Sequence, residues 1–273
     1  MALALSAPVF AITSQLIEDA TGLHYDIKDA DLLAERLSRR AGELGFDSLL
    51  DYYYFLRYDS GGAREIECLV DLLVVNETYF FREIDQLRAL VDVIVPRVLA
   101  RQPRVRIWCA ACSTGEEAYS LAMLLDERAL LDRADIEASD ISARVLPIAE
   151  GGVYAGRSLR ALLPAERRRH FVELNDGAVR VRDRFRNRIR WRRANLLQPT
   201  PVDDAGRFDV ILCRNALIYF RDETVVKIVG WLAERLSPGG YLLVGASESL
   251  LRYGTALACE EHGGSFFYRK AGP

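Results

Sequence analysis

Residues 105–130 read VRIWCAACSTGEEAYSLAMLLDERAL. A short apolar run leads into the small-residue turn Ser113-Thr114-Gly115, and apolar residues at helical spacing follow, so we expect a strand, a tight loop and a helix. The pattern recurs downstream in the strand-like stretches IEASD (136–140), RFDVILC (207–213) and YLLVGAS (241–247) and in the helical stretch 223–236. Strands that alternate with helices indicate an α/β fold, a mostly parallel sheet covered on both faces. SFFYRK (265–270) is predicted to add a final edge strand.

The part of the chain before this sheet carries helical spacing. Leu33, Leu37 and Ala41 form one apolar stripe, and Ile66 and Leu69 begin another. We therefore predict an all-helical domain over residues 1–92 and a sheet-containing domain over residues 93–273.

Composition limits the class of protein. Of 273 residues, 50% are hydrophobic, which is enough to build a core, and the formal net charge of −3 argues against general nucleic-acid binding. The N-terminus lacks the basic start of a signal peptide, and no apolar run reaches the roughly 18 residues that a membrane span needs. We expect a cytoplasmic protein without membrane insertion.

The five cysteines are odd in number and lie mostly in apolar runs, so we expect reduced thiols. Cys109 and Cys112 form a C-x-x-C, but no second pair follows and the histidines are scattered. The spacing therefore predicts no metal site.

An unusual stretch, GAVRVRDRFRNRIRWRRANLL, covers residues 177–197 and has arginine at every even position from Arg180 to Arg192. Period-two alternation is typical of a strand or hairpin with one solvated face. We predict a small β insertion at about residues 171–194.

Polar residues follow the predicted strands at the edge where α/β folds bind ligands. Glu116, at a helix start, would interact with the helix dipole or pair with a cationic ligand. Asp140 would cap the next helix or hold the hydroxyls of a ribose. Two further polar segments are NETYFFR (76–82) and CRNALIYF (213–220). Each would contact a ligand or have an ordinary structural role. For NETYFFR that role would be a seam between domains, and for Tyr219 in CRNALIYF it would be that of a half-buried core aromatic.

Taken together, NETYFFR, AACSTGEEAYSLAM, ASDIS, FDVILCRNALIYF and LSPGGYLLVGASESL occur in an order that closely resembles the CheR family of chemoreceptor methyltransferases. The resemblance covers nearly the whole chain. It implies a Rossmann-like methyltransferase domain, preceded by the helical domain, that transfers a methyl group from S-adenosylmethionine to receptor glutamate side chains and releases S-adenosylhomocysteine.

The resemblance also implies roles for individual residues. The catalytic pair would be Arg82 and Tyr219. The cofactor-binding residues would be Asn76, Thr78, Arg82, Glu116, Asp140, Asn195, Leu196, Arg214 and Asn215. Glu248 also matches the family, with no role that the sequence explains. A glutamate carboxylate is already ionised at neutral pH, so Arg82 and Tyr219 would aim the acceptor and no general base is needed.

Two basic surfaces would meet an acidic receptor: Arg36, Arg39 and Arg40 on the second predicted helix, and the Arg180–Arg192 series, helped by Arg167–Arg169. Two other functions stay open. One is a methyltransferase acting on a small molecule or RNA, which the arginines favour and the acidic balance disfavours. The other is a non-catalytic receptor-binding module.

Overall fold

The computed structural model describes residues 3–198 and 207–272, which divide into two compact units. Unit 1 contains the residues up to Val75 together with Tyr219–Thr224, and unit 2 contains the rest. The sequence prediction placed the boundary at residue 92. The difference arises because residues 84–99 are helical yet pack in the core of unit 2, where Leu87, Leu90 and Ile94 are fully buried.

Unit 1 is a group of helices: α1 (Ala7–Thr21), α2 (Ala30–Glu43), α3 (Leu49–Tyr58) and α4 (Gly62–Leu73). The stripe predicted on α2 is the centre of its core, since Leu33, Leu37 and Ala41 are fully buried. Beside this core, Arg40 donates to both carboxylate oxygens of Glu65 at 2.7 Å, and the Tyr52 hydroxyl donates to Glu65 at 2.6 Å. The buried Glu65 is therefore fully compensated within unit 1.

The helices and strands of unit 2 alternate as predicted. The helices are α5 (Ile84–Ala89), α6 (Val95–Leu99), α7 (Glu116–Glu127), α8 (Val145–Gly151), α9 (Pro164–His170), α10 (Asp183–Arg186) and α11 (Asp222–Arg235), the last beginning in unit 1. A π-helical turn, Leu90–Ile94, joins α5 to α6. The strands are β1 (Val105–Ala110), β2 (Ala134–Asp140), β3 (Val153–Tyr154), β4 (Phe171–Glu173), β5 (Val179–Val181), β6 (Ile189–Arg193), β7 (Phe208–Cys213), β8 (Leu236–Val244), β9 (Ala258–His262) and β10 (Ser265–Arg269).

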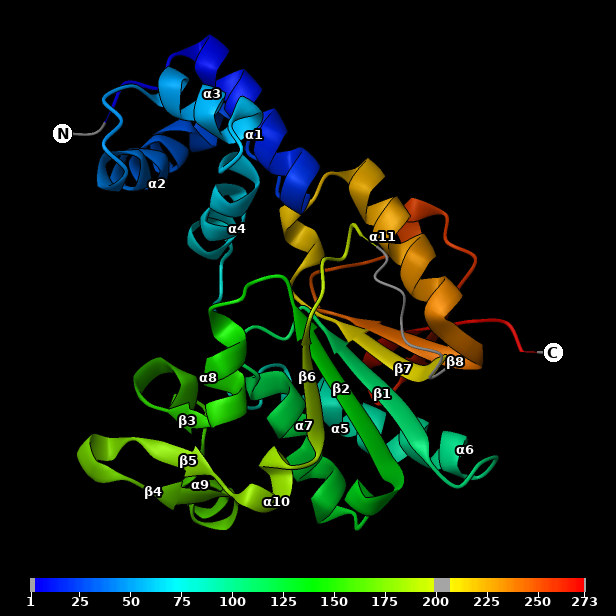
Figure 1. Ribbon diagram of the computed structural model, residues 1–273. Helices are drawn as coiled ribbons and strands as arrows, with labels where there is room; N and C mark the ends of the chain where they lie inside the picture. The colour runs from blue at the N-terminus through cyan, green and yellow to red at the C-terminus, as the bar shows by residue number, and fades with distance from the viewer. Residues whose placement is uncertain (1–2, 199–206, 273) are drawn as a thin grey trace. The chain divides into compact units, whose positions relative to one another are not determined.

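Seven strands form the main sheet in the order β6-β2-β1-β7-β8-β10-β9 (Figure 1). The first five are mutually parallel, and β10 is antiparallel to β8. Residues 265–270 were predicted as the edge strand. β10 instead lies inside the sheet, because the hairpin partner β9 pairs with its outer side.

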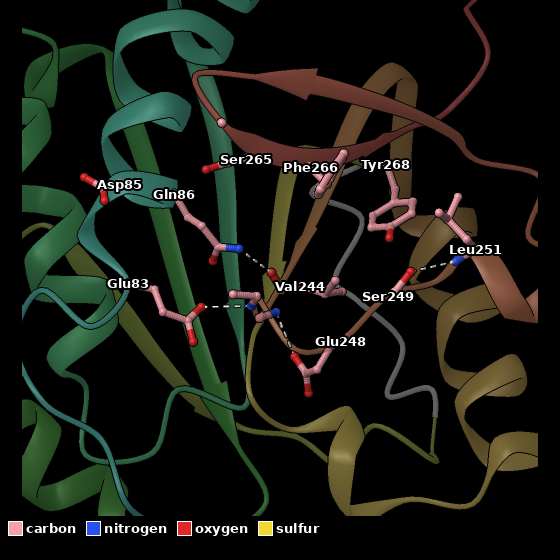
Figure 2. Close-up of a pocket in the computed structure, with 13 residues that line it drawn as sticks. Glu83, Asp85, Gln86, Val244, Glu248, Ser249, Leu251, Ser265, Phe266 and Tyr268 are labelled. Atoms are coloured by element: carbon pink, nitrogen blue, oxygen red, sulfur yellow. Dashed lines mark hydrogen bonds between the residues drawn. The ribbon is translucent and has the colours of Figure 1, made fainter.

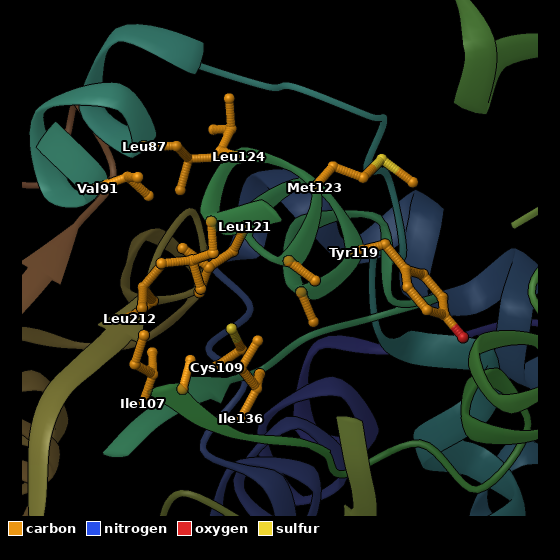
Figure 3. Packing of buried hydrophobic residues seen from close by; sticks show 14 of the residues in the cluster. Leu87, Val91, Ile107, Cys109, Tyr119, Leu121, Met123, Leu124, Ile136 and Leu212 are labelled. Atoms are coloured by element: carbon orange, nitrogen blue, oxygen red, sulfur yellow. The ribbon is translucent and has the colours of Figure 1, made fainter. Parts of the chain in front are cut away.

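The core of unit 2 lies between the sheet and the helices α5–α7. Alternate residues of β1 face this layer, so Ile107 and Cys109 pack with Leu121 of α7 and Leu212 of β7 (Figure 3). The intervening Trp108 faces the opposite side, where its ring centroid lies 5.4 Å from that of Trp231 in α11. Both faces of β1 are therefore covered, as the continuous apolar run of its sequence predicts.

The insertion differs from the prediction of a β element at residues 171–194. A three-stranded sheet of order β3-β5-β4 spans residues 153–181. α10 interrupts the arginine series, and β6 joins the main sheet beside β2. The period-two pattern hid this arrangement because an edge strand of a large sheet shows the same alternation as a hairpin.

Most of these arginines have partners within unit 2. Arg184 pairs with Asp126 at 2.7 Å and Arg188 pairs with Asp132. Arg190 and Arg192 both pair with Glu137, at 3.0 and 3.2 Å. The series is therefore largely a set of internal ion pairs, which offsets the repulsion between like charges.

All five cysteines are free thiols. Cys109, Cys112 and Cys213 are buried and Cys259, on β9, is exposed. Within residues 3–198 and 207–272, no helix is long and apolar enough to span a membrane.

Candidate functional site

The parallel strands place part of the predicted site on one edge of the sheet, namely Glu116, Asp140, Asn195, Leu196, Arg214 and Asn215. β1, β2, β6, β7 and β8 all end at this edge, and the loops that follow them carry the polar residues. Backbone amides at such an edge face away from the sheet, which is where α/β folds bind nucleotide-like ligands.

The loop between β1 and α7 is a tight turn held by Asp140. Ser113 and Gly115 have φ of 49° and 94°, and a Cβ on Gly115 would lie 2.7 Å from the Trp191 ring, so this position needs glycine. The Asp140 carboxylate accepts hydrogen bonds from the backbone amides of Ser113 (2.8 Å) and Ser142 (3.0 Å). Asp140 thus caps its own turn and shapes the neighbouring loop.

Glu116 is fully buried at the first turn of α7. Its carboxylate accepts hydrogen bonds from the hydroxyls of Thr114 (2.6 Å) and Ser158 (2.7 Å). Burial raises the pKa of Glu116, and the two hydroxyl donors only partly oppose this shift. A cation placed beside this carboxylate would restore its charged form.

The segment NETYFFR is anchored by its two phenylalanines. Phe80 and Phe81 are buried in the core of unit 2, and the Phe80 ring packs edge-on against Tyr154 with centroids 4.8 Å apart. The preceding residues reach the β1–α7 loop, since the Ser113 hydroxyl donates to the Asn76 carbonyl at 3.1 Å. The sequence alternative of a seam between domains does not describe the phenylalanines, which lie inside unit 2.

Arg82 and Asn76 have side-chain hydrogen-bond donors that remain available near this loop. Arg82 is half-buried and donates one guanidinium hydrogen bond to the Glu77 carbonyl at 3.1 Å. The Asn76 side-chain nitrogen is buried and, among the described residues, has no hydrogen-bond partner. Buried amide groups are normally paired, so this donor is available to a ligand acceptor.

Arg214 is embedded beneath the edge. Its guanidinium donates to Gln86 (2.8 Å), Glu117 (2.8 Å), Glu83 (3.2 Å) and the Arg82 carbonyl (2.9 Å), and its side chain is 1% exposed. In these contacts Arg214 cross-links β7, α7 and the NETYFFR segment. The sequence did not indicate this network, because each partner lies about a hundred or more residues from Arg214 in the chain.

Glu248 has a structural role that the sequence did not explain. Its carboxylate accepts hydrogen bonds from the backbone amides of Asn215 (2.6 Å), Gly245 (2.7 Å) and Ile218 (3.2 Å). These contacts tie the loop after β7 to the loop after β8 and hold Asn215 at a φ of 57°. A Cβ on Gly245 would lie 2.8 Å from this carboxylate, so glycine is required there.

Tyr219 belongs to unit 1, whereas Arg82 belongs to unit 2. The Tyr219 carbonyl accepts a hydrogen bond from the His24 amide at 2.9 Å, and Phe220 pairs with Leu23 in an isolated β-bridge. The ring packs against the core of unit 1.

Asn195 and Leu196 follow β6 in a short turn. The Asn195 side-chain oxygen accepts a hydrogen bond from the Leu197 amide at 2.9 Å. Thr78 is half-buried within the NETYFFR segment. These residues, with Asn76, Asp140 and Glu116, offer the mixture of amides, hydroxyls and carboxylates that a nucleoside with a cationic amino-acid tail requires, so the residues present fit S-adenosylmethionine. In the part of the chain that the structure describes, no group of His, Cys, Asp or Glu could hold a metal ion.

The sheet topology and this polar edge define a Rossmann-like α/β domain of the kind that binds nucleoside cofactors. Residues 76–262 match the family model described as CheR methyltransferase, SAM binding domain, and residues 9–74 match CheR methyltransferase, all-alpha domain. The chain belongs to the CheR methyltransferase family, and its second unit is an S-adenosylmethionine-dependent methyltransferase domain.

Curated relatives agree with the family assignment. The chain is 36% identical to chemotaxis protein methyltransferase 2 of Vibrio cholerae over 85% of this chain and 82% of the relative. It is 37% identical to a chemotaxis protein methyltransferase of Vibrio parahaemolyticus over 91% of this chain and 92% of the relative. A Klebsiella aerogenes protein of the same name is 36% identical over 90% of this chain and 85% of the relative.

Proposed function

We propose that this chain methylates glutamate side-chain carboxylates of methyl-accepting chemotaxis receptors and releases S-adenosylhomocysteine. The observation that carries the proposal is the family membership. The relatives that align with most of this chain are named chemotaxis protein methyltransferases. The anchoring of NETYFFR at the β1–α7 loop supports it, because this segment carries Arg82 to the edge where Asp140 and Glu116 lie.

S-adenosylmethionine, when bound, supplies an electrophilic methyl group. The acceptor carboxylate is ionised at neutral pH, so the chain's residues have only to bind it, orient it and exclude water. Arg82 is suited to hold a carboxylate because a guanidinium pairs with it through two parallel hydrogen bonds. In this proposal the Tyr219 hydroxyl donates a further hydrogen bond to the acceptor.

The receptor-binding surface needs revision from the sequence prediction. Arg40 is committed to Glu65, and Arg36 donates to the carbonyls of Leu72 (3.3 Å) and Leu73 (2.8 Å) at the end of α4. Arg39 is exposed. Of the three arginines on α2, we therefore assign receptor docking to Arg39.

The decisive assay is transfer of a radiolabelled methyl group to receptor-containing membranes, with base-labile product. Arg82→Ala should lower the single-turnover rate strongly and Tyr219→Phe less, since it loses one hydroxyl. Heat-treated protein serves as the blank. Absence of base-labile label with folded protein that binds S-adenosylhomocysteine would refute the proposed substrate, and unchanged rates in both variants would refute the assignment of Arg82 and Tyr219.

A further inference from the structure

A second concave site lies on the same edge of unit 2, at the other half of the sheet. It is a pocket of about 460 Å³ at the carboxyl end of β8, bounded by the start of α5 and the start of β10 (Figure 2). None of the residues predicted to bind the cofactor or to act in catalysis lines it. The pocket shares Glu83, Gln86 and Glu248 with the hydrogen-bond network beneath the edge, but the predicted cofactor-binding and catalytic residues do not account for it.

The charged residues of this pocket are all acidic. Among the described residues, Glu83, Asp85 and Glu248 line it, and no lysine, arginine or histidine does. Burial acts to raise the pKa of Glu83, but hydrogen bonds from Asn215 and Ala246 and the nearby Arg214 outweigh it and lower the pKa, so Glu83 is a carboxylate at neutral pH. Asp85, which also lines the pocket, is exposed. Arg214 donates hydrogen bonds to Glu83 and also to Glu117, so its single positive charge is shared between two carboxyl groups.

The walls of the pocket are apolar. Val244 and Tyr268 are buried, whereas Phe266 and Leu251 are 55% and 70% exposed. Figure 2 shows Phe266 and Tyr268 on the β10 side, across Val244 from Glu83 and Gln86. Large apolar side chains left exposed around a pocket mark a binding surface.

We infer that this pocket binds a basic side chain, arginine or lysine, of the acceptor protein. The aliphatic stem would lie against Leu251 and the face of Phe266, and the cationic head would approach Glu83 and Asp85. This combination matches what such side chains require, an apolar surface for the stem, an aromatic face and a carboxylate for the charge. The inference rests on the proposed function only in taking the acceptor protein as the source of that side chain.

Blocked arginine, Nα-acetyl-arginine methylamide, is the direct probe, and the corresponding citrulline amide is its neutral control of nearly equal shape. Titration followed by NMR of the full chain should show weak binding of the arginine probe, about three- to fivefold tighter than citrulline, because one exposed cation–carboxylate and cation–π contact is at stake. Binding should persist with S-adenosylhomocysteine at saturation. Equal binding of the two probes, or competition by S-adenosylhomocysteine, would overturn the inference.

Two surface variants locate the site. Asp85→Asn and Phe266→Ala should each weaken the arginine probe by about threefold, while Glu150→Gln, an exposed carboxylate on α8, should leave it unchanged. Unchanged affinity in both pocket variants would place the binding elsewhere and refute the inference. Methyl transfer to receptor membranes is measured on the same proteins. Transfer without arginine binding would refute the pocket alone, and arginine binding without transfer would refute the proposed substrate alone.

Discussion

Asp140 has an observed role in the fold and an expected role in ligand binding. Its carboxylate orders the β1–α7 loop through the Ser113 amide, and the family resemblance assigns it to the cofactor. We expect Asp140→Ala to weaken S-adenosylhomocysteine binding by about 2–3 kcal/mol, the size of a lost charge-assisted contact. Calorimetric titration measures this. Glu150→Ala is the control, and an unchanged Kd in folded Asp140→Ala would remove Asp140 from the site.

Arg214 gives a second residue-level prediction, with a pH dependence. Arg214→Met strands the buried carboxylate of Glu117, whose side chain is 14% exposed, and should destabilise the folded state by roughly 3–5 kcal/mol at neutral pH.

The sign of the pH effect follows from Glu117. Burial raises its pKa, and Arg214 opposes this shift, so the variant raises the folded-state pKa further. A carboxyl with a raised folded-state pKa binds more protons when folded, and stability falls as pH rises from the unfolded value through the folded one. The deficit of Arg214→Met in urea unfolding should therefore be smaller at pH 5 than at pH 8. An equal deficit at both would show that Glu117 is not the stranded group.

Long motifs allowed many residues of the candidate site to be predicted from the sequence. The contacts that could not be predicted join residues far apart in the chain. Asp140 and Glu116 could be placed because each directly follows a recognisable strand or turn. Nothing local indicated that Ser158 would donate to Glu116, or that Glu248 would tie two loops together. Such contacts depend on how distant loops meet, which hydrophobic period does not encode.

The contacts of helix α2 show which of its arginines stabilise unit 1 and which is exposed for binding a receptor. On α2, Arg40 and Arg36 stabilise unit 1, so we expect Arg40→Met to lower the free energy of unfolding by roughly 2–3 kcal/mol through the buried Glu65. Arg39→Glu should leave stability unchanged and raise the KM for receptor membranes, more at low salt than at high salt.

Chemical unfolding and methylation kinetics of the two α2 variants separate these roles. Lys28→Glu, an exposed basic residue just before α2, is the charge-matched control for Arg39→Glu. If Arg39→Glu and Lys28→Glu give the same KM at low salt, α2 is not a specific docking element.

The element boundaries that were predicted incorrectly share one cause. Residues 84–92 fell within the predicted helical domain and residues 189–193 within the predicted β insertion, and they are helical and extended respectively. The hydrophobic spacing could not show which unit or which sheet each segment packs into. Leu87 and Leu90 pack on the sheet of unit 2, and β6 pairs with β2, because tertiary packing selects among surfaces of similar apolar character.

Among the described residues, unit 1 and unit 2 each have a hydrophobic core built from their own side chains. We expect differential scanning calorimetry to resolve two transitions, since each core can melt as its own cooperative unit. S-adenosylhomocysteine at a hundred times its Kd should stabilise the larger unit by about 2.7 kcal/mol and raise only that transition. Asp140→Ala at the same ligand concentration should show a smaller rise. A single transition that moves as a whole would contradict this expectation.

The distribution of thiols makes the protein suitable for site-selective labelling. Burial raises the pKa of Cys109, Cys112 and Cys213 well above that of a free thiol, so these groups stay protonated and unreactive. Cys259 is exposed on β9 and pairs across the hairpin with Tyr268, a wall of the pocket beside β8. A maleimide fluorophore should react there ahead of the half-buried Cys68 and the three buried cysteines, and its emission would report binding at the neighbouring pocket without any engineered cysteine.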